Sequence, residues 1–204
     1  MSDWLAAPRT ELAADRILDG VRSLFRTRGR AGVSGVGMAE VAAAAGCSRA
    51  TLYRYFPNRQ ALFVAFADRE AQRVVARVWR ERGTVTDPAA ALLDTLLAVL
   101  AAVRGTEYLA VWFEPVNAGV VAQLSDSSQA VEVLASQFVA SLRPDLDPAA
   151  ARRLGRWLVR SVVSLLTMPA EPDEERELLR AFVIPFLAGL DDSDSNPLFR
   201  STSV

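Results

Sequence analysis

The sequence predicts an all-α protein of about nine helices. Apolar residues recur at three- and four-residue steps through almost every segment, which is the period of an amphipathic helix. No segment shows the strict apolar–polar alternation of a half-buried strand, and no internal repeat is visible. Joints such as Asp87-Pro88 and Asp147-Pro148 divide the pattern into separate helices.

Four helices are expected in the first 82 residues. The first ends at Gly29 and carries a periodic apolar face made of Ala14, Ile17, Leu18, Val21, Leu24 and Phe25. A glycine-rich loop follows, and then two short helices near 38–45 and 49–55, separated by the turn Gly46-Cys47-Ser48. Asn58 is a natural N-cap, and it predicts a long helix over about 58–82.

Five more helices are expected after residue 87. One starts at Asp87-Pro88, and a shorter aromatic one follows Gly105-Thr106. Segment 117–128 is interpreted as a connection, and helices follow near 131–142, from Asp147-Pro148 and from about Asp173 to 190. Pro185 is expected to kink the last helix or to cap its final turn. The acidic, serine-rich tail, 191–204, is expected to be disordered.

The composition argues against several classes of protein. The chain has no histidine and no lysine, and its one cysteine is Cys47. The usual general base and the usual zinc ligands are therefore missing, so we expect no enzyme activity, no metal and no cofactor. The longest apolar stretch, near 96–103, is far shorter than the roughly 20 residues that cross a bilayer. We expect no membrane partner and a reducing, cytoplasmic location.

Charge is distributed unevenly along the chain. Residues 1–60 contain nine arginines and five acidic residues, whereas the remaining 144 residues contain 14 arginines and 19 acidic residues. A positive N-terminal third on a negative body is typical of a nucleic-acid-binding head joined to a domain with a different partner.

The stretch 38–62 has the features of a helix-turn-helix. The first helix of such a motif crosses the second closely, and the alanines 42–45 provide small side chains for that crossing. Gly46 is suited to the left-handed conformation that ends a helix, and the Ser48 hydroxyl is suited to capping the next one.

The second short helix is expected to have a buried face and an exposed face. Leu52 and Phe56 are four residues apart and should pack inward, whereas the opposite face should enter a major groove of DNA. Arg59, at the start of the next helix, is expected to meet a phosphate through its charge and the helix dipole. The expected DNA-binding residues are Ser48, Arg49, Ala50, Thr51, Tyr53, Arg54, Tyr55 and Arg59.

The segment "EVAAAAGCSRATLYRYFPNRQALFVAF" resembles the TetR (tetracycline-repressor-like) transcriptional regulators. The resemblance places Thr51, Tyr53 and Tyr55 on DNA-contacting positions, and Arg59 where the family usually has a phosphate-binding lysine. It places Arg49 and Ala50 on the variable, base-reading positions. The chain departs from the family pattern at Gly37, where a capping threonine is common, and at Cys47, where valine is common.

The resemblance also implies an overall organisation. A helix-turn-helix DNA-binding domain, 1–57, would precede a helical effector-binding and dimerisation domain, 58–190. The last two long helices would pair across a two-fold axis, so that a homodimer binds a palindromic operator, usually as a repressor. Their periodic apolar faces are equally compatible with packing inside one chain. The candidate dimer-interface residues are Leu158, Val162, Leu165, Phe182 and Phe186.

A small, mainly apolar effector is expected because the later helices are rich in leucine and aromatic residues. The candidate effector-binding residues are Leu97, Leu100, Tyr108, Trp112, Phe113, Asn117, Leu134, Phe138 and Trp157. Aromatic residues at helical spacing are more often ordinary core, and that alternative applies to each of them. Two other functions stay open: a constitutive DNA-binding regulator without an effector, and a helical enzyme acting on a hydrophobic substrate.

Overall fold

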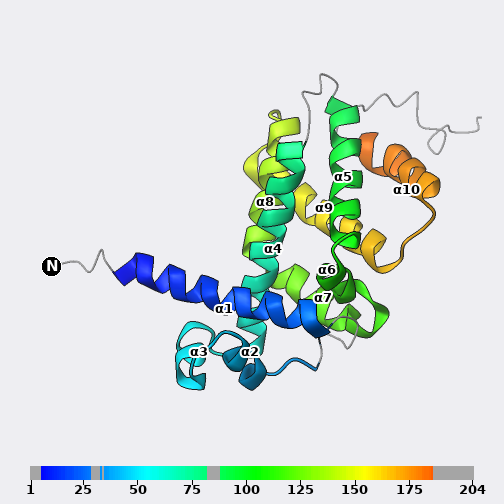
Figure 1. Cartoon of the computed structure of the whole chain (residues 1–204). Coiled ribbons are helices and arrows are strands. Elements are labelled where there is room, and N and C mark those ends of the chain that lie inside the picture. Colours follow the sequence, from blue (N-terminus) through cyan, green and yellow to red (C-terminus); the bar gives the residue numbers. More distant parts are fainter. Residues whose placement is uncertain (1–5, 29–32, 34, 82–87, 186–204) are drawn as a thin grey trace, which may run out of the picture. The chain divides into compact units, whose positions relative to one another are not determined.

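The structure, a computed structural model, describes residues 6–28, 33, 35–81 and 88–185, which form ten α-helices and several short 3-10 and π turns (Figure 1). No strand occurs within these ranges, and the all-α prediction is confirmed. The helices are α1 Ala6–Arg28, α2 Met38–Ala44, α3 Arg49–Tyr55, α4 Arg59–Glu81, α5 Pro88–Arg104, α6 Glu107–Ala110, α7 Ala118–Ser127, α8 Gln129–Leu142, α9 Pro148–Thr167 and α10 Pro172–Leu178.

The helices belong to two compact units. Unit 1 comprises residues 1–73 and 103–129, and therefore contains α1 to α3, the first two thirds of α4, α6 and α7. Unit 2 comprises residues 74–102 and 130–204, with the end of α4, most of α5, and α8 to α10. The compact units thus divide within α4 and near the end of α5.

Segment 117–128, expected as a connection, contains the additional helix α7. Val121 and Leu124 are buried, and so is Ser128 directly after the helix, which places all three on one helical face. Just before it, the expected aromatic helix is broken. α6 ends at Ala110, and the chain continues through the 3-10 turns η2 (Val111–Phe113) and η3 (Pro115–Asn117).

The last described helix widens before Pro185, the proline that was expected to kink it or to cap its final turn. After α10 the chain forms a π turn, η4 (Leu179–Val183), which lies just before Pro185. Proline has no N–H to donate to the carbonyl four residues earlier, and its ring crowds that carbonyl. The π turn lies within the turn of helix that this defect affects.

An aromatic cluster joins α1 to α4 in unit 1. The ring of Phe25 on α1 lies 5.9 Å from Phe63 and 5.4 Å from Phe66, both on α4. Trp112 on η2 packs edge-on against Phe25 and Phe63, at 5.1 and 5.2 Å between ring centroids. These rings are almost completely buried, so the cluster is the apolar centre of the unit.

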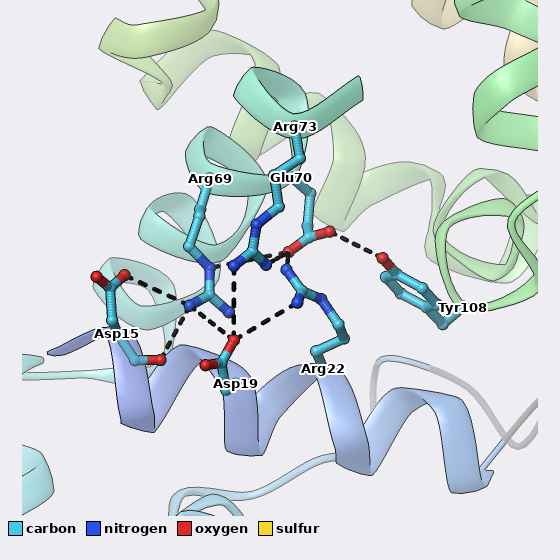
Figure 2. Close-up of polar contacts among 7 residues, drawn as sticks. All are labelled: Asp15, Asp19, Arg22, Arg69, Glu70, Arg73 and Tyr108. Atoms are coloured by element: carbon cyan, nitrogen blue, oxygen red, sulfur yellow. Dashed lines mark hydrogen bonds and ion pairs between the residues drawn. The ribbon is translucent and has the colours of Figure 1, made fainter. Parts of the chain in front are cut away.

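A polar network lies beside this cluster and joins the same two helices to α6 (Figure 2). Glu70 on α4 is only 4% exposed. Its carboxylate pairs with Arg22 on α1 and with Arg73 at 3.0 Å, and it accepts a hydrogen bond of 2.9 Å from the Tyr108 hydroxyl. Arg69 on α4 pairs with Asp19 on α1 at 3.1 Å. Arg69 and Arg73 are thus both paired with acidic residues.

The backbones of α1 and α2 approach each other at Gly20. A Cβ atom at this position would lie 2.7 Å from the Cα of Ala45 and 2.8 Å from its backbone nitrogen. Of the four alanines, Ala42 is buried, whereas Ala43 and Ala44 are exposed. The small residues that allow the close approach of α1 and α2 are therefore Gly20 and Ala45.

Within the described ranges no individual helix has the length and apolar character needed to span a membrane. The pair Ala89–Arg104 and Glu107–Phe113 meets the criterion on combined length and composition, but it is bent by 95°.

Gly20→Ala should lower the free energy of unfolding by about 1–2 kcal/mol, because the new methyl group must push α2 away from α1, and the gain in helix propensity offsets only part of that cost. Urea or thermal denaturation measures the change. Gly119→Ala on α7 is the matched control, since nothing lies within 4 Å of a Cβ there. Equal stability of the two variants would contradict the close approach.

Tyr108 should make stability fall at alkaline pH. Burial, and then the hydrogen bond to Glu70, raise the pKa of Tyr108 above its ordinary value of 10.0. As pH rises through that ordinary value, the unfolded chain loses a proton that the folded chain retains, so the free energy of unfolding decreases until the raised pKa is passed. Tyr108→Phe should abolish this decrease and should cost about 1 kcal/mol at neutral pH.

Urea denaturation between pH 8 and 11.5 tests the effect of Tyr108. The absence of lysine leaves few other groups that titrate in this range. Tyr53→Phe, at an exposed position, is the control for loss of a tyrosine hydroxyl and should be as stable as wild type at neutral pH. An unchanged slope in Tyr108→Phe would show that the hydroxyl does not hold its proton as described.

Candidate nucleic-acid interface

The turn between α2 and α3 closes as the sequence predicts. Gly46 has a φ of +63°, the left-handed conformation that glycine adopts without strain. The Gly46 N–H donates to the Ala43 carbonyl at 3.1 Å, and the Cys47 N–H donates to the Ala42 carbonyl at 3.0 Å. This pair of bonds is the Schellman motif that ends many helices. Cys47 therefore contributes its backbone to the turn, and its side chain is half-buried.

The start of α2 is capped without a side chain from the N-cap residue. Gly37 occupies the N-cap, and its N–H donates to Oε2 of Glu40 at 3.0 Å. Glu40 also forms an ion pair with Arg28 at the end of α1. The carboxylate of Glu40 thus supplies half of a capping box and ties α2 to α1.

The start of α3 is held by two hydroxyl groups. The backbone N–H of Thr51 donates to Oγ of Ser48 at 3.0 Å, and the two side-chain oxygens lie 2.9 Å apart. This confirms Ser48 as the N-cap. Leu52 is completely buried and Phe56 is 7% exposed, so these two side chains attach α3 to the interior of unit 1.

The opposite face of α3 is exposed, as its helical period predicts. Arg49, Ala50, Tyr53 and Arg54 all belong to the exposed class, and the ring of Tyr53 is 42% accessible. Ser48 is exposed at the N-cap. Thr51 and Tyr55 are half-buried at the edges of the face. Two guanidinium groups and two phenol rings thus lie on or beside one short helix, which suits hydrogen bonding to base edges and phosphates.

Arg59 lies differently from the expectation of a phosphate contact. Asn58 caps α4 as predicted, since its Oδ1 accepts from the Ala61 N–H at 2.8 Å. The guanidinium of Arg59, however, donates from Nε to the Val36 carbonyl at 2.9 Å and from Nη2 to the Val33 carbonyl at 2.8 Å. At least two of its donors therefore serve the loop that precedes α2. Sequence reasoning missed this contact because the two elements lie more than 20 residues apart.

The candidate effector-binding residues are divided between the two units. Tyr108, Trp112, Phe113 and Asn117 belong to unit 1, whereas Leu97, Leu100, Leu134, Phe138 and Trp157 belong to unit 2. In unit 1, Trp112 lies in the aromatic cluster, Tyr108 binds Glu70, and the buried Asn117 donates from Nδ2 to the Val111 carbonyl at 2.7 Å. In unit 2, Phe138 packs edge-on against Trp79 at 6.2 Å, and Trp157 is 41% exposed.

The candidate dimer-interface residues differ in their exposure. Leu158 is buried within unit 2, and Val162 and Leu165 are half-buried. Phe182 is 45% exposed. Phe186 and the tail 191–204 lie outside the described residues.

Comparison with known proteins agrees with this arrangement. Residues 17–66 match the family model for bacterial regulatory proteins of the tetR family. Over 187 residues the chain is 42% identical to uncharacterized HTH-type transcriptional regulators of Mycobacterium tuberculosis, strains CDC 1551 and H37Rv, with 91% of each chain covered.

Two solved structures share the fold. The TetR family repressor AlkX from Dietzia sp. strain DQ12-45-1b, implicated in biodegradation of n-alkanes, aligns with a TM-score of 0.60 and 23% identity over 85% of this chain and 94% of its own. The fatty acid degradation regulator FadR from Bacillus halodurans aligns with a TM-score of 0.50 and 14% identity over 83% and 95%. With the matched family model over residues 17–66 and relatives 42% identical over 91% of its length, the chain belongs to the TetR family of helix-turn-helix transcriptional regulators.

Proposed function

We propose that the protein is a homodimeric, cytoplasmic repressor that binds a palindromic operator and is released from it by a small, mainly apolar effector. Residues 1–57 would bind DNA, and residues 58–190 would bind the effector and form the dimer. The observation that carries the proposal is the exposed face of α3, with Arg49, Ala50, Tyr53 and Arg54 outward while Leu52 is completely buried.

Each exposed side chain of α3 has a role that its chemistry supports. Arg49 lies in the first turn, where its forked donors suit O6 and N7 of a guanine. Ala50 allows close approach of the backbone and contact with a thymine methyl group. Tyr53 offers a hydroxyl group to a phosphate, and Arg54 offers a charge to a phosphate or a base edge.

A dimer is supported by apolar side chains exposed on the last described helices. Trp157 on α9 is 41% exposed, and Leu178 and Phe182 on α10 and the following π turn are 38% and 45% exposed. A two-fold dimer would present two copies of α3 to successive major grooves, so the operator would have two-fold symmetry.

An apolar effector is supported by the leucine- and aromatic-rich composition of the later helices. The structural neighbours AlkX and FadR are named for n-alkane and fatty acid degradation, so n-alkanes and fatty acids are sensible first probes. The constitutive regulator remains the alternative to be tested. The enzyme alternative is disfavoured because the relatives are named as transcriptional regulators.

Selection from a randomised duplex library should yield a two-fold symmetric site with half-site centres about 34–36 Å apart or somewhat more.

Arg49→Ala should weaken binding to the selected duplex by about 1–3 kcal/mol and relax base preference at one position of each half-site. Arg54→Gln should reduce the salt slope of binding by about one per subunit if its charge neutralises a phosphate. Fluorescence anisotropy over a salt series measures both. Equal losses for Arg49→Ala on selected and scrambled duplexes would exclude base reading by this residue.

An effector should release the selected duplex. At saturating concentrations of an n-alkane or a fatty acid that binds, affinity for DNA should fall by roughly 5- to 150-fold, the usual range of allosteric coupling. Anisotropy with each probe, and with cell extract as a broader source of ligands, measures the effect. DNA affinity that stays constant with every probe and with the extract would favour the constitutive regulator.

A further inference from the structure

Arg59, the first residue of α4, is bonded to the loop in front of α2. We propose that Arg59 is a positioning residue of the DNA-binding unit: its guanidinium clamps the Val33–Val36 turn, and so determines where α2 begins and how α3 is presented to DNA. A phosphate contact, which the resemblance implies at this position, is then not its main role. The inference rests on the proposed use of α3 as the recognition helix.

The clamp is a two-point contact with one turn. Val36 donates its N–H to the Val33 carbonyl at 3.2 Å, which closes the turn. Nη2 of Arg59 donates to that same Val33 carbonyl at 2.8 Å, and Nε donates to the Val36 carbonyl at 2.9 Å. Both valines are almost completely buried, so their carbonyls need partners from within the protein.

The flat face of the Arg59 guanidinium also has a contact, with an aromatic ring. Its central carbon lies 4.6 Å from the ring centroid of Phe63, one turn further along α4. Phe63 is itself 2% exposed and packs against Phe25 and Trp112. Arg59 thus connects the loop to the aromatic cluster that joins α1 to α4, and the flat shape of a guanidinium is needed for both contacts.

The contacts of Arg59 lie directly before α2, where they can affect the position of α3. Val36 directly precedes Gly37, the N-cap of α2, and α2 is joined to α3 by the hydrogen-bonded turn at Gly46. A looser turn at Val33–Val36 would therefore allow α2 and α3 to shift together. Hydrogen bonds to base edges depend on such placement more strongly than general attraction to phosphates does.

Hydrogen exchange of the DNA-free protein tests the clamp directly. Arg59→Lys retains the charge but has neither the fork nor the flat face, and Arg59→Gln removes the charge. In both variants the amide hydrogens of residues 35–47 should exchange about tenfold faster than in wild type. This is the change expected when one charge-assisted hydrogen bond is lost. Arg26→Gln, at an exposed arginine of the same unit, is the matched control and should exchange as wild type does. Circular dichroism checks that each variant is folded.

DNA binding tests the consequence. Both Arg59 variants should bind the selected duplex about tenfold more weakly, bind a scrambled duplex within about twofold of wild type, and retain the wild-type salt slope. A lower specificity ratio separates misplacement of α3 from a partly unfolded sample, because unfolding would weaken binding to both duplexes equally. Arg54→Gln serves as the reference for loss of a phosphate contact.

Two results would overturn the clamp. The first would be the pattern of a phosphate contact. Arg59→Lys would then bind DNA and exchange its amides as wild type does, and Arg59→Gln would have a salt slope reduced by about one per subunit. The other is unchanged exchange of residues 35–47 in both variants. If wild-type protein shows no salt-dependent binding to any duplex, the proposed function fails, whereas the exchange measured without DNA still decides whether the clamp exists.

Discussion

The aromatic contact between α1 and α4 is the interaction on which the DNA-binding unit depends. α2 and α3 have only seven residues each, well below the roughly 12–15 that an isolated helix needs for even marginal stability in water. They depend on tertiary packing: Leu52 and Phe56 of α3 are buried, α3 packs against α2, and the end of α2 lies against α1 at Gly20. Phe25 from α1 and Phe63 from α4 join the two longer helices, and Trp112 completes the cluster.

Polar contacts then restrict how the two long helices align. A carboxylate as buried as that of Glu70 is costly unless it is paired, so its ion pair with Arg22 favours the register of α1 and α4 that brings the two groups together. Tyr108 adds a hydrogen bond from α6 to the same carboxylate. Near the start of α4, Arg59 bonds the loop that leads into α2. In the proposed arrangement, the position of α3 therefore depends on residues outside its exposed face.

Much of this organisation could be predicted from local patterns. The caps of α3, α4 and α9 by Ser48, Asn58 and Asp147 depend on residues two or three positions apart, and all three are present. α7 was missed because Gly119 and the surrounding polar residues resemble a connection, although Val121 and Leu124 have helical spacing and are buried. The pairing of Arg69 could not be predicted from local patterns, because its partner Asp19 lies 50 positions away on another helix.

By itself, the sequence determined the all-α class, the order of the helices apart from α7, and the exposed face of α3, since each follows from periodicity and capping within a few residues. Only the tertiary structure decided which small residues meet at the crossing of α1 and α2, which charges are paired, and what Arg59 binds. Each of these contacts joins groups that are distant in the chain. On an isolated helix the same side chains would be surrounded by water, so the local sequence does not specify their partners.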